Sequence, residues 1–247
     1  MRLYFIALQF LTIIPLPFAV RCEERDLGRS MAFFPFVGLT LGGLLVGVNH
    51  LLGMVLPRTV TDILLIALLA GITGALHLDG VADVFDGLAA RGGRQRFLDV
   101  MKDPRCGPVG AAALVLFLLI KYQTLVAVPV AGKDAALLLF PLMGRFSQVL
   151  CTVGSVRART DGLGSTFIGG AGWPQLMAAT VTALAGALYL AGLAGIGLFG
   201  IICLVVWWLR WWSHQRLGGI TGDIIGFVSE MSEAVSLLTL VVIGSSF

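Results

Sequence analysis

Long apolar stretches alternate with short polar connections along most of this chain. Glycine and alanine are frequent in these stretches, as is usual where helices pack closely in lipid. A helix needs about 20 residues to cross a bilayer. Seven stretches come close to this length with few charges: residues 31–56, 60–78, 107–130, 134–153, 174–192, 195–213 and 231–246. The pattern predicts an all-α, polytopic integral membrane bundle with about seven transmembrane helices.

An eighth apolar stretch, residues 3–18, is shorter and contains Pro15 and Pro17. We expect a short N-terminal helix that lies at the membrane interface or spans the membrane. The alternative is a cleavable signal peptide, since Arg2 precedes the apolar run. No linker or low-complexity segment divides the chain, so residues 1–247 are expected to form a single membrane domain.

The composition supports the same class, because 57% hydrophobic and 13% charged residues exclude an ordinary soluble domain. The four cysteines are far apart, without the spacing of a zinc site or a disulfide framework. The net charge of +3 and the basic loops suit membrane lipid with anionic head groups. No nucleic-acid-binding motif is present, and the small residues on the spans would permit a homo-oligomer.

Basic residues concentrate in alternate connections, namely residues 21–29, 91–105, 157–159 and 210–216. The opposite connections carry only Arg58 and Lys133. By the positive-inside rule, the first set of connections faces the cytoplasm.

One of these connections, residues 77–110, carries an unusual density of charge. It contains five aspartates and five basic residues: Asp79, Asp83, Asp86, Asp99, Asp103, Arg91, Arg94, Arg96, Lys102 and Arg105. On a helix the first three aspartates share one face, and Asp99 and Asp103, four apart, share another. Clustered carboxylates repel one another, and their short side chains suit Mg²⁺ or Mn²⁺. The alternative is a solvated loop whose acids pair with its bases.

The basic residues of this segment can hold phosphate oxygens that carboxylates alone would repel. Its glycines, among them Gly87, allow close approach of the backbone to a ligand. Aspartates that can bind a metal, next to basic residues that can bind phosphate, predict chemistry on a phosphate or pyrophosphate at the cytoplasmic membrane surface.

The segment from Asp83 to Arg91 reads D-x-x-D-G-x-x-A-R, followed by Asp99 and Asp103. It resembles the signature of the CDP-alcohol phosphotransferases, in which an alcohol attacks a nucleotide-activated phosphate. The family's spacing between its Arg and the third Asp is longer, with a glycine that is missing here. A lipid enzyme of this type is therefore an alternative function.

A second resemblance covers nearly the whole chain. The blocks FLTIIPLP, RSMAFFPFVGLTLG, GALHLDGVADVFDGL, MKDPRCGPVGA and GGITGDIIG occur in this order between residues 10 and 226. They resemble the cobalamin synthase family, the adenosylcobinamide-GDP ribazoletransferases. The resemblance implies a Mg²⁺-dependent enzyme of the bacterial inner membrane. It would join α-ribazole, or its 5′-phosphate, to adenosylcobinamide-GDP with release of GMP, giving adenosylcobalamin or its 5′-phosphate.

The two resemblances together suggest roles for the charged residues. The candidate Mg²⁺ ligands are Asp79, Asp83, Asp86 and Asp99. Asp103 is the candidate general base for the ribazole hydroxyl, by analogy with the phosphotransferase signature. Three basic residues would neutralise phosphate charge as GMP leaves: Arg91, Lys102 and Arg105.

Two further loops are expected on the same side of the membrane. In residues 218–226, Thr221 and Asp223 either cap the last helix or contact substrate at the acidic segment, as Gly87 would. In residues 157–167, Arg157, Arg159 and Asp161 either bind substrate or reflect the positive-inside bias alone.

Other charges and aromatic residues lie in the apolar stretches. Lys121 and Arg145 are expected to face the bundle interior or to extend to the interface. The run WWLRWW, residues 207–212, is expected to anchor the protein at the interface, with a corrin-stacking surface as the alternative. A cation-coupled transporter is a third candidate function. Transporters, however, place such charges near the midplane and often show inverted repeats, which we do not find here.

Overall fold

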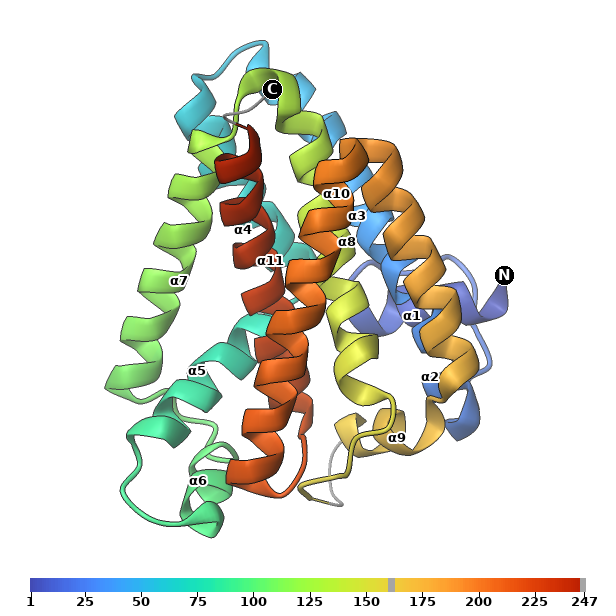
Figure 1. Ribbon diagram of the computed structural model, residues 1–247, viewed down its shortest axis with the longest axis vertical. Helices are drawn as coiled ribbons and strands as arrows, with labels where there is room; N and C mark the ends of the chain where they lie inside the picture. Colours follow the sequence, from blue (N-terminus) through green and yellow to red (C-terminus); the bar gives the residue numbers. More distant parts are fainter. Residues whose placement is uncertain (160–162, 245–247) are drawn as a thin grey trace.

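The computed structural model describes residues 1–159 and 163–244, and this part of the chain is helical, without a β-strand (Figure 1). Its α-helices are α1 (Arg2–Leu11), α2 (Glu24–Ser30), α3 (Phe34–Gly53), α4 (Arg58–Ile72), α5 (Leu76–Ala89), α6 (Arg94–Val100), α7 (Pro108–Ala127), α8 (Lys133–Thr152), α9 (Leu163–Gly170), α10 (Trp173–Leu217) and α11 (Gly222–Gly244). Short 3₁₀ helices, η1 (Met31–Phe33) and η2 (Val130–Gly132), precede α3 and α8. The predicted all-α class is confirmed.

Five helical segments of the described chain are long and apolar enough to cross a membrane: Arg25–Gly53, Pro108–Ala127, Val130–Thr152, Trp173–Leu217 and Gly222–Ile243. Helices α4 and α5 meet the same test only as a pair, which would make six, and they are bent by 89°. The multi-pass character is therefore confirmed, whereas the count of seven is not.

The bend and a helical hairpin explain the difference in count. Gly74 and Ala75, with φ of 60° and 55°, end α4 in left-handed backbone and turn α5 away from it. In α10, Gly192 has φ 57° and ψ −136°, and the chain reverses there into a second arm (Figure 1). A Cβ on Gly195 would lie 1.9 Å from the Ala187 carbonyl oxygen, so glycine lets the two arms touch.

Helix α8 forms the centre of the bundle and is buried along most of its length, packed against α3, α10 and α11. Two glycines of α3 allow this contact. A Cβ on Gly38 would lie 2.5 Å from the Pro141 carbonyl oxygen, and one on Gly42 would lie 2.7 Å from Leu138 Cα. Helix α1, with ten residues, is shorter than a span, and it buries Ala7 in the same core.

One cluster of buried charges, from α7, α8 and α11, lies inside the bundle. Lys121 Nζ is 2.8 Å from a Glu230 oxygen and 2.5 Å from a Glu233 oxygen, and Arg145 pairs with the other Glu233 oxygen. Of the two positions expected for Lys121 and Arg145, the bundle interior is the one observed. Their partners were not foreseen: Glu230 lies just before the span expected at residues 231–246 and Glu233 lies within it, and both belong to α11, which begins at Gly222.

The basic connections gather at one end of the bundle, as their alternation along the chain requires. Helix α6, the segment after α8 and the turn between α10 and α11 lie at the bottom of Figure 1. The α3–α4 and α7–α8 connections lie at the top.

Candidate active site

Helix α5 presents the first aspartates of the acidic segment, and its helical form agrees with the sequence pattern. The helix crosses α11 at Gly80, where an added Cβ would lie 2.4 Å from the backbone oxygen of Asp223. This close approach brings Asp223, from the far end of the chain, beside Asp79 and Asp83.

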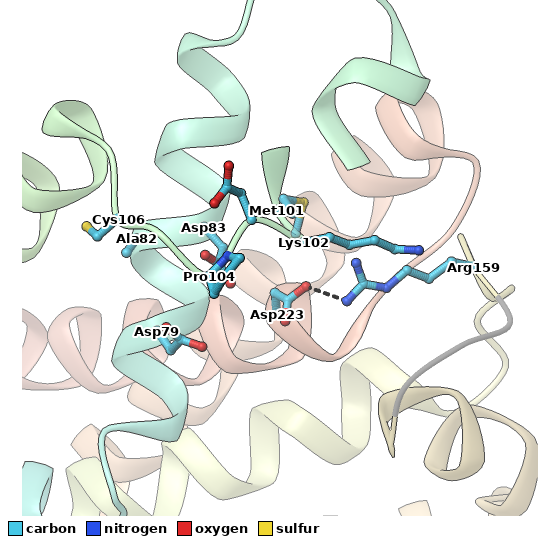
Figure 2. A pocket seen from close by; sticks show the side chains of 10 residues that line it. Asp79, Ala82, Asp83, Met101, Lys102, Pro104, Cys106, Arg159 and Asp223 are labelled. Carbon is cyan, nitrogen blue, oxygen red and sulfur yellow. Dashed lines mark hydrogen bonds and ion pairs between the residues drawn. The ribbon is translucent and has the colours of Figure 1, made fainter. Parts of the chain in front are cut away.

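A pocket of about 470 Å³ opens between α5, α11 and the connection after α6 (Figure 2). Carboxylates, two cationic side chains and a thiol converge on it. Its lining residues are Asp79, Ala82, Asp83, Met101, Lys102, Asp103, Pro104, Cys106, Arg159 and Asp223. Arg159 lies 3.0 Å from Asp223, and this ion pair is drawn as a dashed line in Figure 2. We call this pocket the acidic pocket.

The carboxylates of the acidic pocket are electrostatically crowded. Partial burial and then the neighbouring charges of Asp79 and Asp223 raise the pKa of the Asp83 carboxyl to about 7. Helix α5, which carries Asp83, is not among the five spanning segments. The charge of Arg159 offsets part of this effect on the pKa, and a bound cation would offset more of it.

Asp86 has a different environment from Asp79 and Asp83. Its oxygens accept hydrogen bonds from the backbone amides of Gly107 at 2.7 Å and Gly110 at 2.8 Å. These amides belong to the first turn of α7, where a carboxylate satisfies unpaired donors and the helix dipole. Cβ atoms at the two glycines would lie within 2.5 Å of Asp86 oxygens, which explains why glycine occupies both positions. Asp86 thus ties α5 to α7, outside the lining of the acidic pocket.

Asp103 lines the acidic pocket but is bound by a neighbour. The Arg105 side chain donates to both of its oxygens, at 2.9 and 2.7 Å, and these bonds lower the pKa of Asp103 to about 2. The expectation that Asp99 and Asp103 share one helix face is wrong, because α6 ends at Val100. Pro104 disfavours helical backbone at the residue before it, and Asp103 instead accepts a turn bond from Arg105 N–H.

Three other predicted site residues lie outside the lining of the acidic pocket. Asp99 is exposed on α6 and accepts a hydrogen bond from Gln95 at 2.9 Å. Arg91 is exposed in the connection before α6. Gly87 is buried where an added Cβ would lie 2.5 Å from the Phe97 ring, so it allows α5 and α6 to pack.

The segment around Thr221 caps the last helix, and it also brings Asp223 to the acidic pocket. Thr221 Oγ1 accepts from Ile224 N at 3.3 Å and so caps α11, while Asp223 points into the acidic pocket. The opposing loop contributes Arg159, whereas Asp161 lies outside the described residues. Backbone bonds between residues 156–158 and Ile220 hold the two segments together, and Arg94 donates to the Ala158 and Leu217 carbonyls.

A second cavity of about 280 Å³ adjoins the acidic pocket and shares Asp79, Arg159 and Asp223 with it. The rest of its lining is largely apolar: Phe10, Met31, Phe34, Leu76, His77, Gln148, Phe167, Gly222, Ile225 and Gly226. We call it the aromatic cavity. The sequence pattern did not reveal it, because its walls come from seven helices and a loop that are far apart in the sequence, and its phenylalanines look like ordinary core residues.

The donor set suits a hard cation that keeps other ligands. Within residues 1–159 and 163–244, no group of three or more His, Cys, Asp or Glu side chains is arranged to hold a metal by itself. Mg²⁺ usually takes one or two carboxylates and completes its shell with water and substrate phosphate. Asp79, Asp83 and Asp223 fit that requirement by their oxygen chemistry and their shared pocket.

The tryptophan run of α10 lies apart from both cavities. Trp207 and Trp211 are 66% and 52% exposed and line an open groove with Arg210 and His214. Large exposed aromatic side chains beside a cationic one are typical of a membrane interface.

Comparison with known proteins places the chain in a family. A relative named adenosylcobinamide-GDP ribazoletransferase from Geotalea daltonii is 60% identical over 247 residues, the full length of both chains. A relative of the same name from Pseudomonas syringae pv. syringae is 38% identical, and the match covers 96% of this chain and 98% of the relative. Another, from Acetivibrio thermocellus, is 34% identical, and the match covers 93% of each chain. No solved structure matches the chain. The family model described as cobalamin-5-phosphate synthase matches residues 3–241, and the chain belongs to this family.

Proposed function

We propose that this protein is an adenosylcobinamide-GDP ribazoletransferase, a membrane enzyme that joins α-ribazole, or its 5′-phosphate, to adenosylcobinamide-GDP and releases GMP. The observation that carries the proposal is the acidic pocket, in which Asp79, Asp83 and Asp223 converge with Lys102 and Arg159 in a chain of this family. A relative that matches this chain over the full length of both bears the name of this activity.

The reaction exchanges a phosphoanhydride bond for a phosphate ester bond. A ribazole hydroxyl oxygen forms a bond to the cobinamide-side phosphorus of the pyrophosphate. The bridging P–O bond breaks, GMP leaves with the bridging oxygen, and the hydroxyl loses its proton. Lys102 and Arg159 line the acidic pocket where they can neutralise the phosphate charge that builds up on the leaving group.

A Mg²⁺ ion held by Asp79, Asp83 and Asp223 would supply the positive charge that the pyrophosphate and the crowded carboxylates both require. Asp103 remains the candidate proton acceptor because it lines the same pocket. Since Arg105 engages both of its oxygens, proton transfer to Asp103 requires that ion pair to open. Arg105 would then be available for phosphate.

We also propose that the acidic pocket faces the cytoplasm of the bacterial inner membrane. The support is the positive-inside rule together with the gathering of the basic connections at the end of the bundle that carries the pocket (Figure 1). The position of the pocket at one end of the bundle also argues against a transporter, whose ion sites lie near the midplane.

Turnover by the purified protein in liposomes tests the proposal. The substrates are adenosylcobinamide-GDP and α-ribazole 5′-phosphate with Mg²⁺, and GMP and the corrinoid product are separated by chromatography. We expect product from the wild type and none from Asp83→Asn, whose matched control is Asp134→Asn at the opposite end of the bundle. Transfer from a CDP-alcohol in place of this reaction would refute the proposal and favour the phosphotransferase alternative.

A further inference from the structure

The aromatic cavity is built to hold a flat, mostly apolar group. Phe10, Phe34 and Phe167 form a ring cluster with centroids 4.3–6.2 Å apart, contributed by α1, α3 and α9. Aromatic faces and edges of this kind favour a stacked aromatic ligand. With about 280 Å³, the cavity is at the low end for small-molecule sites, which suits a two-ring base and is small for a corrin.

His77, which lines this cavity, has a buried ring nitrogen without a hydrogen-bond partner among the described residues. His77 is 3% exposed, and its Nδ1 forms no hydrogen bond within the described part of the chain. Its Nε2 lies 2.8 Å from Gln148 Nε2, which also donates to Ser229 Oγ at 2.9 Å. A buried polar atom of this kind is unfavourable unless a ligand satisfies it.

The hydrogen-bond chain determines which proton His77 carries. Ser229 Oγ donates to the Gly144 carbonyl, so it accepts from the Gln148 amide nitrogen. The second amide hydrogen of Gln148 then points to His77 Nε2, which acts as the acceptor. In the neutral imidazole the remaining hydrogen lies on Nδ1, which is therefore a donor without an acceptor.

From these contacts, we propose that the aromatic cavity binds the benzimidazole base of the ribazole acceptor and that His77 Nδ1–H donates to its unsubstituted ring nitrogen. This inference rests on the proposed function and specifies one of its two substrates. In a benzimidazole nucleoside one ring nitrogen bears the sugar and the other is a single acceptor, which matches one donor in an apolar wall.

The wall between the aromatic cavity and the acidic pocket indicates where the ribose of the ribazole acceptor would lie. Asp79, Arg159 and Asp223 line both cavities, so a ribose attached to the base reaches the acidic pocket there. Its hydroxyl then meets the pyrophosphate among the carboxylates. The guanine of the other substrate is a poorer fit to the apolar part of the aromatic cavity. Its several donors and acceptors would face three phenylalanines and an amide already engaged with His77 and Ser229, because the charged residues lie on the wall shared with the acidic pocket.

A substrate change tests the hydrogen bond without altering the protein. The ribotide of indole has the shape of the benzimidazole ribotide but carries C–H in place of the unsubstituted nitrogen. For the wild type we expect kcat/KM to be about tenfold lower with the indole ribotide, the usual effect of one lost neutral hydrogen bond. For His77→Phe we expect the two ribotides to be used equally, and for the exposed control His50→Phe we expect the wild-type ratio.

The ring cluster has a test of its own. Phe167→Ala should raise KM for the ribazole substrate about tenfold and leave KM for adenosylcobinamide-GDP unchanged. Phe199→Ala removes a ring that lines neither cavity and should change neither KM.

The outcomes separate this inference from the function on which it rests. Equal use of both ribotides by the wild type, or an effect of Phe167→Ala on KM for adenosylcobinamide-GDP alone, would overturn the base site while the function stands. The second result would assign the cavity to guanine. Absence of product from the wild type with every ribotide would overturn both.

Discussion

The crossing of α5 and α11 at Gly80 sets the distance between the carboxylates of the acidic pocket. Asp79 and Asp83 flank Gly80 along α5, and the atom that faces it is the backbone oxygen of Asp223. The substitution Gly80→Ala adds a Cβ 2.4 Å from that oxygen, where ordinary contact begins at 3.4 Å. The two helices must therefore separate by about 1 Å. The displaced groups are those that would hold the metal and the pyrophosphate.

Gly80→Ala has two opposing effects on stability, whereas its only expected effect on activity is a decrease. Overpacking costs about 1–3 kcal/mol, and replacing glycine by alanine within a helix gains about 1 kcal/mol. We therefore expect the melting temperature in detergent to fall slightly. A misplacement of about 1 Å in an active site costs on the order of 100-fold in rate, so kcat/KM for GMP release should fall by about this factor.

Gly43→Ala is the matched control, because an added Cβ on Gly43 of α3 meets no atom within 4 Å. It should retain wild-type activity and be at least as stable as the wild type, because only the gain from helix propensity applies there. If Gly80→Ala had activity within threefold of the wild type, the relative position of α5 and α11 would not control catalysis. The proposed sharing of one metal and pyrophosphate site by Asp79, Asp83 and Asp223 would then be wrong.

Three further predictions concern the buried charges, the cap of α7 and the metal. Glu233→Gln leaves Arg145 and Lys121 short of negative charge and should cost about 3–5 kcal/mol of stability in thermal unfolding, whereas the exposed control Glu23→Gln should not. Asp86→Asn weakens the cap of α7 and should cost about 1–2 kcal/mol, measured in the same assay; an unchanged melting temperature would contradict this role. Chelation by EDTA should abolish GMP release and added Mg²⁺ should restore it; full activity in the chelator would exclude the metal site.

The class of the fold could be predicted from the sequence because lipid leaves few choices for an apolar chain. Each apolar stretch had to become a helix that satisfies its own backbone, and the stretches are visible by length alone. The count was harder to predict, because it depends on single backbone positions. Ala75 adopts a left-handed conformation that its side chain does not favour, so the bend between α4 and α5 was not visible in the pattern. The reversal at Gly192 lies at the boundary expected between residues 174–192 and 195–213.

The site could be predicted where local periodicity determines it. Asp79 and Asp83 are four residues apart on one helix, and they line the acidic pocket as expected. Asp86 belongs to the same stripe, yet the nearest unpaired donors are the first amides of α7, which draw it to a capping role. Arg159 and Asp223 come from loops whose proximity depends on tertiary structure, so the sequence left their roles open.

A network of buried polar and charged side chains connects the fold of the bundle to the site. Lys121 and Arg145 balance Glu230 and Glu233 in charge, and Gln148 and Ser229 continue the polar contacts towards His77 at the start of α5. A cation in lipid without its anion is strongly unfavourable, so the pairs fix the register of α7, α8 and α11 against one another. The same helices carry, or pack against, the carboxylates and the imidazole of the two cavities. The buried ion pairs, which take no part in the reaction, therefore determine the relative positions of the groups that do.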